Sequence, residues 1–160
     1  MEWLETIIDE HQIESKEAGE TAKQEKEKKL KELDQRISAV NHAANNLILP
    51  LLKSVEATLN KKGCSAEVVT SEEEERQTKR NYIKKLALVL SRSHSGNKSS
   101  DGIDPAFRII INVNDSNVTV SYRTNTCSQF EEISITLENL TPTTIEPMLQ
   151  KYMKTYFAVT

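Results

Sequence analysis

Cysteine is nearly missing from this sequence. Cys64 and Cys127 are the only two among 160 residues, and neither belongs to a Cys-x-x-Cys pair. The N-terminal stretch MEWLETIIDEH is acidic, and it lacks the basic residues and the apolar run that form a secretory signal. Two isolated cysteines without such a signal predict reduced thiols in a cytoplasmic protein, which excludes a small disulfide-stapled fold.

Long apolar runs and an excess of positive charge are lacking as well. No stretch approaches the roughly 18 consecutive apolar residues of a membrane span, so we expect no contact with a membrane. The net charge is −3, whereas nucleic-acid-binding domains usually carry a basic excess. Hydrophobic residues make up 37% of the chain and charged residues 28%, a balance that predicts a solvated segment outside the core.

Motifs for metal binding and covalent catalysis are missing too. His11, His42 and His94 lie in different segments, and no His-Glu-x-x-His or paired-cysteine spacing occurs. There is no Gly-x-Ser-x-Gly elbow, and nothing in the sequence brings Cys127 to a histidine. We therefore expect a protein that is not an enzyme, with no catalytic, cofactor-binding or metal site.

The stretch SRSHSGNKSSDG at residues 91–102 contains the residue types of a phosphate-binding loop in the wrong order. Such a loop reads Gly-x-x-x-x-Gly-Lys-Ser/Thr and leads into a helix whose N-terminus holds the phosphate. Here Ser91 stands at the first glycine position, Lys98 comes one place late, and a strand pattern follows. Serine, glycine and asparagine are typical of turns, so the stretch predicts a long turn between two strands.

What the sequence does contain, over its first third, is helical periodicity. One side of a helix at residues 2–13 is apolar and comprises Trp3, Leu4, Ile7, Ile8 and His11. Trp3 and Ile7 make this side a candidate contact for a protein partner. Residues 15–36 hold thirteen charged side chains, which predicts a helix surrounded by solvent.

A sharper pattern follows at residues 30–51, where apolar residues alternate at spacings of three and four, as at the a and d positions of a heptad. These seam positions are Leu30, Leu33, Ile37, Val40, Ala44, Leu47 and Leu51. The seam must pack either on a second copy or on the rest of its own chain, and we favour self-association as a homodimer. Pro50 predicts a bend at residues 46–50, and Gly63 predicts the end of the helix.

From residue 64 the apolar period changes from helical to two, which indicates strands. They are expected at residues 64–70, 86–91, 106–113, 117–124 and 133–137. A final helix is expected at residues 141–157. The fold class is therefore α+β: an N-terminal long helical, coiled-coil-like stem (1–62), then a domain (63–160) with a four- to five-stranded antiparallel sheet covered by a C-terminal helix.

The run SEEEERQTKRN at residues 71–81 predicts a charged connector, since its acids lack the spacing of a calcium loop. Basic residues after it, with one aromatic residue, support an alternative function: binding of a ligand or a nucleic acid in a cleft between the sheet and the stem. The residues assigned to this alternative are Lys79, Arg80, Tyr82, Lys84, Lys85, Arg108 and Arg123. The neighbouring acids oppose their charge, so our first hypothesis is a protein-interaction and assembly module that associates through its stem.

Overall fold

The computed structural model describes residues 2–91, 105–123 and 131–159. The predicted turn at 91–102 beyond Ser91, with His94, and the residue Cys127 lie outside this range. The helical part comprises α1 (Glu2–His42), a π-helical turn η1 (Ala43–Ile48) and α2 (Leu49–Lys61). The remaining elements are β1 (Ser65–Glu74), β2 (Asn81–Ser91), β3 (Ala106–Asn112), β4 (Asn117–Arg123), β5 (Glu131–Thr136), a short 3₁₀ helix η2 (Leu137–Asn139) and α3 (Pro142–Val159).

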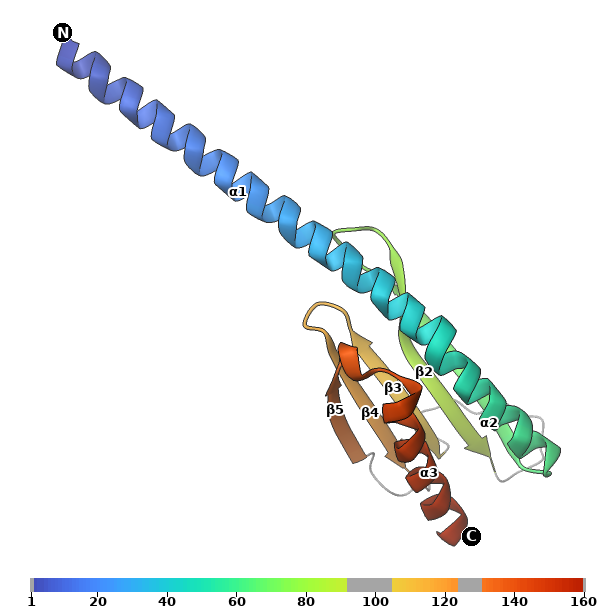
Figure 1. Cartoon of the computed structure of the whole chain (residues 1–160). Coiled ribbons are helices and arrows are strands. Elements are labelled where there is room, and N and C mark those ends of the chain that lie inside the picture. Colours follow the sequence, from blue (N-terminus) through green and yellow to red (C-terminus); the bar gives the residue numbers. More distant parts are fainter. Residues whose placement is uncertain (1, 92–104, 124–130, 160) are drawn as a thin grey trace.

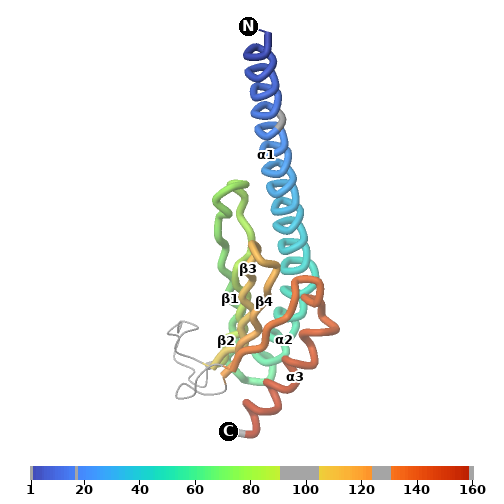
Figure 2. Tube along the Cα trace, turned by 90° about the vertical axis from the view of Figure 1, so that its left-hand side faces the viewer, coloured from blue at the N-terminus to red at the C-terminus, as the bar shows by residue number. Residues whose placement is uncertain are grey.

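The five strands form one antiparallel sheet in which every strand pairs with its neighbours in sequence, in the order β1-β2-β3-β4-β5. The end of α1, α2 and α3 cover one face of this sheet, and the N-terminal part of α1 extends away from it (Figure 1, Figure 2). The predicted α+β class is therefore confirmed, with five strands. Within the described residues, no helix is long and apolar enough to cross a membrane.

Alternating side chains of the central strands build the core between the sheet and the helices. In β2, Leu86, Leu88 and Leu90 are buried in the main cluster, while Ala87 and Val89 between them belong to a second, smaller cluster. Successive side chains of a strand point to opposite faces. Strand β2 thus carries apolar residues on both faces of the sheet.

The inner part of α1 supplies the helical side of the core. Leu33, Ile37, Val40 and Ala44 are buried, the last three completely, and Leu30 is half-buried. Leu33, Ile37, Val40 and Ala44 belong to the main cluster of the same chain. The structure therefore places the first part of the seam against its own sheet, which is the second of the two arrangements that the pattern allowed.

The buried stripe changes its phase at the π-helical turn η1. Leu47 and Leu51, the last two seam positions, stay partly exposed, whereas Ile48 and Leu52 are completely buried. A π turn takes up one residue more than an α turn, so the face that meets the sheet moves one position along the sequence. Pro50, which has no backbone N–H to donate, lies two residues after this turn, within the segment 46–50 where a bend was predicted.

The core extends across the predicted boundary between residues 62 and 63. Its main cluster contains helical residues from Leu33 to Leu59 together with residues of the sheet and of α3. Tyr152 of α3 is buried as its stripe predicted, and its ring centroid lies 5.7 Å from that of Phe107 in β3. We call residues 30–159 the body, and the projecting part of α1, residues 2–29, the outer helix.

Strand β1 is longer than predicted. The acids expected in a connector continue the strand instead: Glu72 pairs with Ile83 and Glu74 with Asn81, after an irregularity next to Ser71. Because β1 is an edge strand, its charged side chains remain in contact with water, and such residues are common on sheet edges. The prediction of a charged connector over the whole run was therefore wrong, and only residues 75–80 connect β1 to β2.

Candidate interaction surfaces

The outer helix is the part of the chain with the least contact with the body. Every described side chain from Glu2 to Lys29 is exposed, and both ribbon views show this part of α1 extending beyond the sheet (Figure 1, Figure 2). At about 1.5 Å per residue the outer helix is roughly 42 Å long. A helix that projects this far presents its whole circumference to other molecules.

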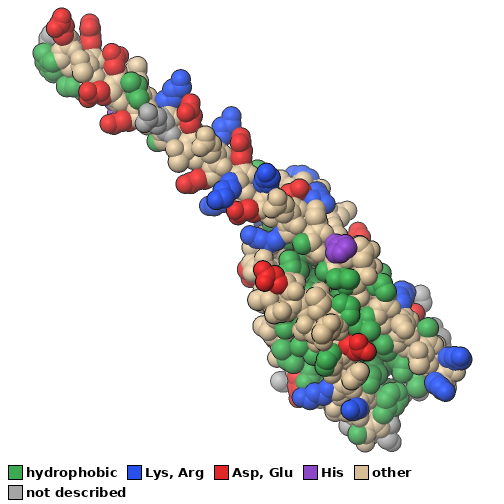
Figure 3. Space-filling view, in the orientation of Figure 1, with side chains coloured by type: hydrophobic (Ala, Val, Ile, Leu, Met, Phe, Trp, Pro, Cys, Tyr) green, Lys and Arg blue, Asp and Glu red, His purple; other side chains and the backbone are tan. Residues whose placement is uncertain are grey.

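Large apolar side chains are exposed at the tip of the outer helix. The exposed fractions are 63% for Trp3, 54% for Ile7, 46% for Ile8 and 41% for Leu4. These residues share one side of the helix, because spacings of three and four residues bring side chains to the same face. Ile13 is 57% exposed, but it lies nine residues after Leu4 and so points to the opposite side. Figure 3 shows apolar and acidic side chains together at this end.

We call residues 23–41, where the outer helix joins the body, the root. Polar contacts hold the root on the β2 side of the sheet. Arg80 donates from Nη1 to Oδ1 of Asp34 at 2.6 Å. About two turns later, the Asn41 amide donates to the Asn81 carbonyl at 3.2 Å and accepts from the Ile83 N–H at 3.1 Å. The Asn41 side chain thus continues the hydrogen-bond pattern of β2 where the strand meets the helix.

A second contact joins the root to the β3–β4 hairpin. Arg36 donates from Nη1 to the backbone carbonyls of Val113 at 3.1 Å and Asn114 at 2.8 Å. Arg36 and Asn41 therefore tie α1 to two different strands. Fixed at two points, the root sets the direction in which the outer helix leaves the body.

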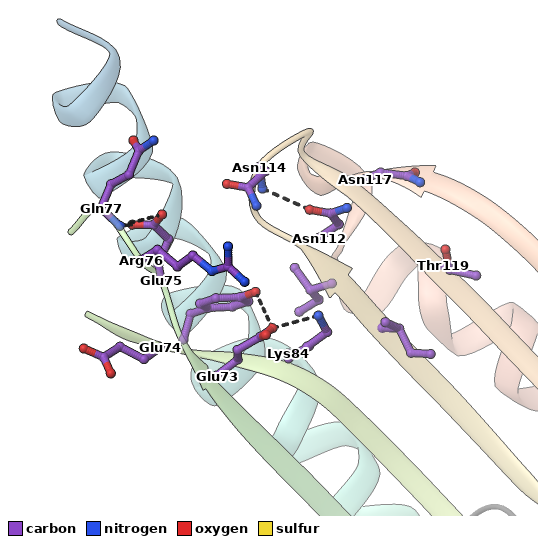
Figure 4. Close-up of a pocket in the computed structure, with 13 residues that line it drawn as sticks. Glu73, Glu74, Glu75, Arg76, Gln77, Lys84, Asn112, Asn114, Asn117 and Thr119 are labelled. Atoms are coloured by element: carbon purple, nitrogen blue, oxygen red, sulfur yellow. Dashed lines mark hydrogen bonds and ion pairs between the residues drawn. The ribbon is translucent and has the colours of Figure 1, made fainter. Parts of the chain in front are cut away.

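A pocket of about 560 Å³ lies between the β1–β2 and β3–β4 hairpins. Glu73 stands on one wall, where its Oε2 accepts from the Tyr82 hydroxyl at 2.9 Å and from Lys84 Nζ at 2.7 Å (Figure 4). Arg76 extends from the same hairpin, and Asn112 lies on the facing hairpin. The pocket combines acids, two cations and amides, a lining suited to a polar ligand.

Protonation in this pocket is governed by Glu73. The hydrogen bond from Lys84, followed by that from Tyr82, lowers the pKa of the Glu73 carboxyl below its ordinary value. Burial and the hydrogen bond to Glu73 raise the pKa of Tyr82 to about 12. At neutral pH the Glu73 carboxylate is therefore ionised and the Tyr82 phenol is neutral.

The structure disperses the seven residues assigned to ligand or nucleic-acid binding. Tyr82 and Lys84 line the pocket, while Arg80 is paired with α1. Lys79 occupies the turn after β1 with a φ of 58°. The other three lie on the face of the sheet away from the helices, as their pairings with the open-face positions of neighbouring strands show: Lys85, Arg108 and Arg123.

The cleft expected between sheet and stem is filled by the core. What remains beside the stem is a hollow of about 450 Å³ at the foot of the outer helix, next to the β3–β4 turn. It is lined by Arg36, Ala39, Asp115, Ser116, Thr136, Leu137 and Glu138. None of the seven predicted residues belongs to this lining.

Sequence reasoning missed the polar residues that hold these surfaces in place. Glu75 is 6% exposed, and its carboxylate accepts from the backbone N–H groups of Gln77 and Thr78, closing the turn that presents Arg80. Desolvation raises the pKa of Glu75, but these hydrogen bonds lower it by more, so the net pKa is below its ordinary value. The sequence showed only a run of acids, and no spacing singled out the buried one.

Among the described residues, no three histidine, cysteine or acidic side chains come together as a metal site. His42 contacts Asn46 through Nδ1 at 2.9 Å, and Cys64 is a half-buried free thiol. Comparisons with protein-family models, with curated proteins and with solved structures each found no match for this chain. The function must therefore be argued from the exposed surfaces of the molecule itself.

Proposed function

We propose that this protein is a non-enzymatic interaction and assembly module that self-associates through its outer helix. The observation that carries the proposal is the exposed apolar tip, with Trp3, Leu4, Ile7 and Ile8 on one side of a helix that no described residue of the body covers. Apolar surface gains free energy when it leaves water, at about 25 cal/mol per Å². A contiguous exposed apolar stripe is typical of a contact site.

The fixed root supports the same proposal. Asp34, Arg36 and Asn41 tie the inner end of the helix to the body, so a partner does not have to immobilise a loose segment. A helix that is oriented in advance loses less conformational entropy on binding. Because most of the seam residues are buried in the body, the proposed contact lies at the tip and does not involve residues 30–51.

The test is the oligomeric state of the full chain, measured by size exclusion with light scattering. The protein concentration runs from about 5 to about 500 μM, which covers the dissociation constants of weak dimers. The wild type should shift toward a dimer with concentration, and Leu4→Asp/Ile8→Asp should remain a monomer. Ile13→Asp is the control: it places an aspartate on the opposite side of the helix and should associate like the wild type. A monomeric wild type, or equal behaviour of the two variants, would contradict the proposal.

A second candidate function is binding of an anionic ligand in the pocket between the hairpins. Arg76 and Lys84 both extend into it, and Tyr82 offers an aromatic face (Figure 4). A single-stranded oligonucleotide is the first probe, because phosphate contacts make affinity fall steeply with salt. Fluorescence titration at low and high salt should show such a fall for the wild type and a loss of binding for Arg76→Ala. No binding at low salt would remove this candidate.

A further inference from the structure

We infer that two copies of the outer helix pair antiparallel, with the acidic tip of each copy against the lysine-rich root of the other. This inference rests on the proposed self-association and adds the orientation and the contacts. Its starting point is an uneven distribution of charge along the helix. Residues 2–15 contain five acids and no lysine or arginine, whereas residues 23–31 contain five lysines and two glutamates.

The apolar stripe of the tip continues along the outer helix with small side chains. Positions spaced alternately by four and three residues share a face, and they read Leu4, Ile8, His11, Ser15, Ala18 and Ala22. Small residues let the backbone of a second helix come close in the middle of the stripe. The large residues at each tip then lie beside the roots, where the long lysine side chains can pack their methylene groups on them.

The two ends of one flank of this stripe are complementary when the flank is reversed. The residues one place after each stripe position read Glu5, Asp9, Gln12, Lys16, Gly19 and Lys23, and Lys26 follows three residues later. Acids occupy the outer end and lysines the inner end. An antiparallel partner places Lys26 opposite Glu5 and Lys23 opposite Asp9, and the two-fold symmetry of the dimer repeats each pair.

A parallel dimer lacks this complementarity. It brings the two tips together and gathers their ten acids at one end without a lysine or arginine among them, and it collects the lysines of both roots at the other end. Within a single copy, Glu5 and Asp9, and likewise Glu10 and Glu14, are like charges four residues apart, a spacing that destabilises a helix. Lysines from an antiparallel partner relieve this repulsion, whereas a second acidic tip adds to it.

The length of the outer helix fits the same arrangement. When Glu5 lies opposite Lys26, Glu2 of one copy lies level with Lys29 of the other, one turn before Leu33, the first buried residue of the body. Leu4 and Val40 are 36 residues apart, or ten turns, so the stripe faces the same side as the buried seam. The partner helix therefore covers the outer part of the stripe and ends where the body covers the rest, with the two bodies at opposite ends.

The experiment measures the dimer dissociation constant of full-length variants by sedimentation equilibrium. Glu5→Lys and Lys26→Glu should each weaken the dimer roughly tenfold, because each change replaces two attractive contacts by two repulsive ones. The double variant Glu5→Lys/Lys26→Glu exchanges the charges and should restore the wild-type constant. The control Glu20→Lys/Lys31→Glu makes the same exchange on the opposite side of the helix and should have no effect.

Salt supplies an independent readout. An antiparallel dimer held by opposite charges should weaken as ionic strength rises, whereas a parallel dimer with repelling tips should strengthen. A wild type that dimerises but tolerates Glu5→Lys, or that strengthens in salt, would overturn the antiparallel pairing and leave self-association intact. A wild type that stays monomeric at all concentrations would overturn both. The variants change exposed side chains of α1, and unchanged circular dichroism confirms that each one is folded.

Discussion

The two parts of α1 carry the same kind of apolar stripe, but this stripe is buried in the inner part and exposed in the outer helix. In the inner part, Ile37 and Val40 are completely buried by the sheet. In the outer helix, Ile7 and Ile8 have about half of their surface in water. Amphipathic periodicity therefore indicates which side of a helix will be covered. It does not indicate whether the same chain or another molecule covers it.

The largest contrast is expected from removing one apolar side chain in each part. Ile37→Ala should lower the free energy of unfolding by about 2–5 kcal/mol, since it leaves a cavity in the core. Ile7→Ala, measured at a concentration where the protein is monomeric, should change it by less than about 0.5 kcal/mol. Urea denaturation followed by circular dichroism measures both. Similar losses for the two variants would mean that the outer helix packs on its own body.

A smaller effect is expected at the polar contact where the two parts of the helix meet the sheet. Asn41→Ala leaves the N–H of the buried residue Ile83 without its partner, which costs about 1–3 kcal/mol of stability. Gln24→Ala is the control in the outer helix, where the amide is exposed and its removal should leave stability unchanged. Thermal or urea unfolding of the two variants checks this, and an equal response would remove Asn41 as an anchor.

Acid should loosen the turn that carries Arg80 to the helix root. The pKa of Glu75 is lowered in the folded protein, so its carboxylate stabilises the fold above the unfolded pKa of about 4.3. This contribution is lost as the pH falls through the lower folded pKa. Glu75→Gln should therefore reduce stability at pH 7 and flatten the stability profile below pH 5. A profile identical to that of the wild type would show that the turn does not depend on this charge.

The smallest effect is expected from the ion pair at the root. Arg80 and Asp34 are bonded at 2.6 Å, but their side chains are 40% and 52% exposed. Exposed ion pairs contribute about 0–1 kcal/mol, so Arg80→Ala should cost at most this much at low salt and less at high salt. If Arg80→Ala lowers the free energy of unfolding by more than about 2 kcal/mol, the effect exceeds that of an exposed ion pair. The pair, rather than Asn41, would then hold the outer helix in place.

The sequence allowed most of the elements to be predicted, because their signals are local. Heptad spacing gave the inner helix, and the period of two gave β2 to β4. The π-helical turn was not predictable, because it arises when the helix adjusts its phase to bury Ile48 and Leu52 on a sheet formed later in the chain. The extension of β1 was missed for a related reason: glutamates disfavour strands by themselves, and only pairing with β2 places them there.

The candidate surfaces were predictable to different degrees. Trp3 and Ile7 were identified from helical spacing alone, and they are exposed together at the tip. Tyr82 and Lys84 were identified as a basic and aromatic pair, but their common partner Glu73 was not. That contact depends on the register between two strands across an irregularity, which no pattern in a single sequence specifies.

The order of the elements along the chain has a consequence during synthesis of the protein on the ribosome. The ribosome delivers the residues from Leu33 to Leu59 before any strand of the sheet that buries them. At about 5–20 residues per second, the roughly 100 residues that follow take about 5–20 s to appear. During that interval the apolar stripe of the inner part of α1 lacks the sheet that covers it, as the stripe of the outer helix does in the folded protein. The folded protein buries this stripe only after the strands of the sheet have been synthesised.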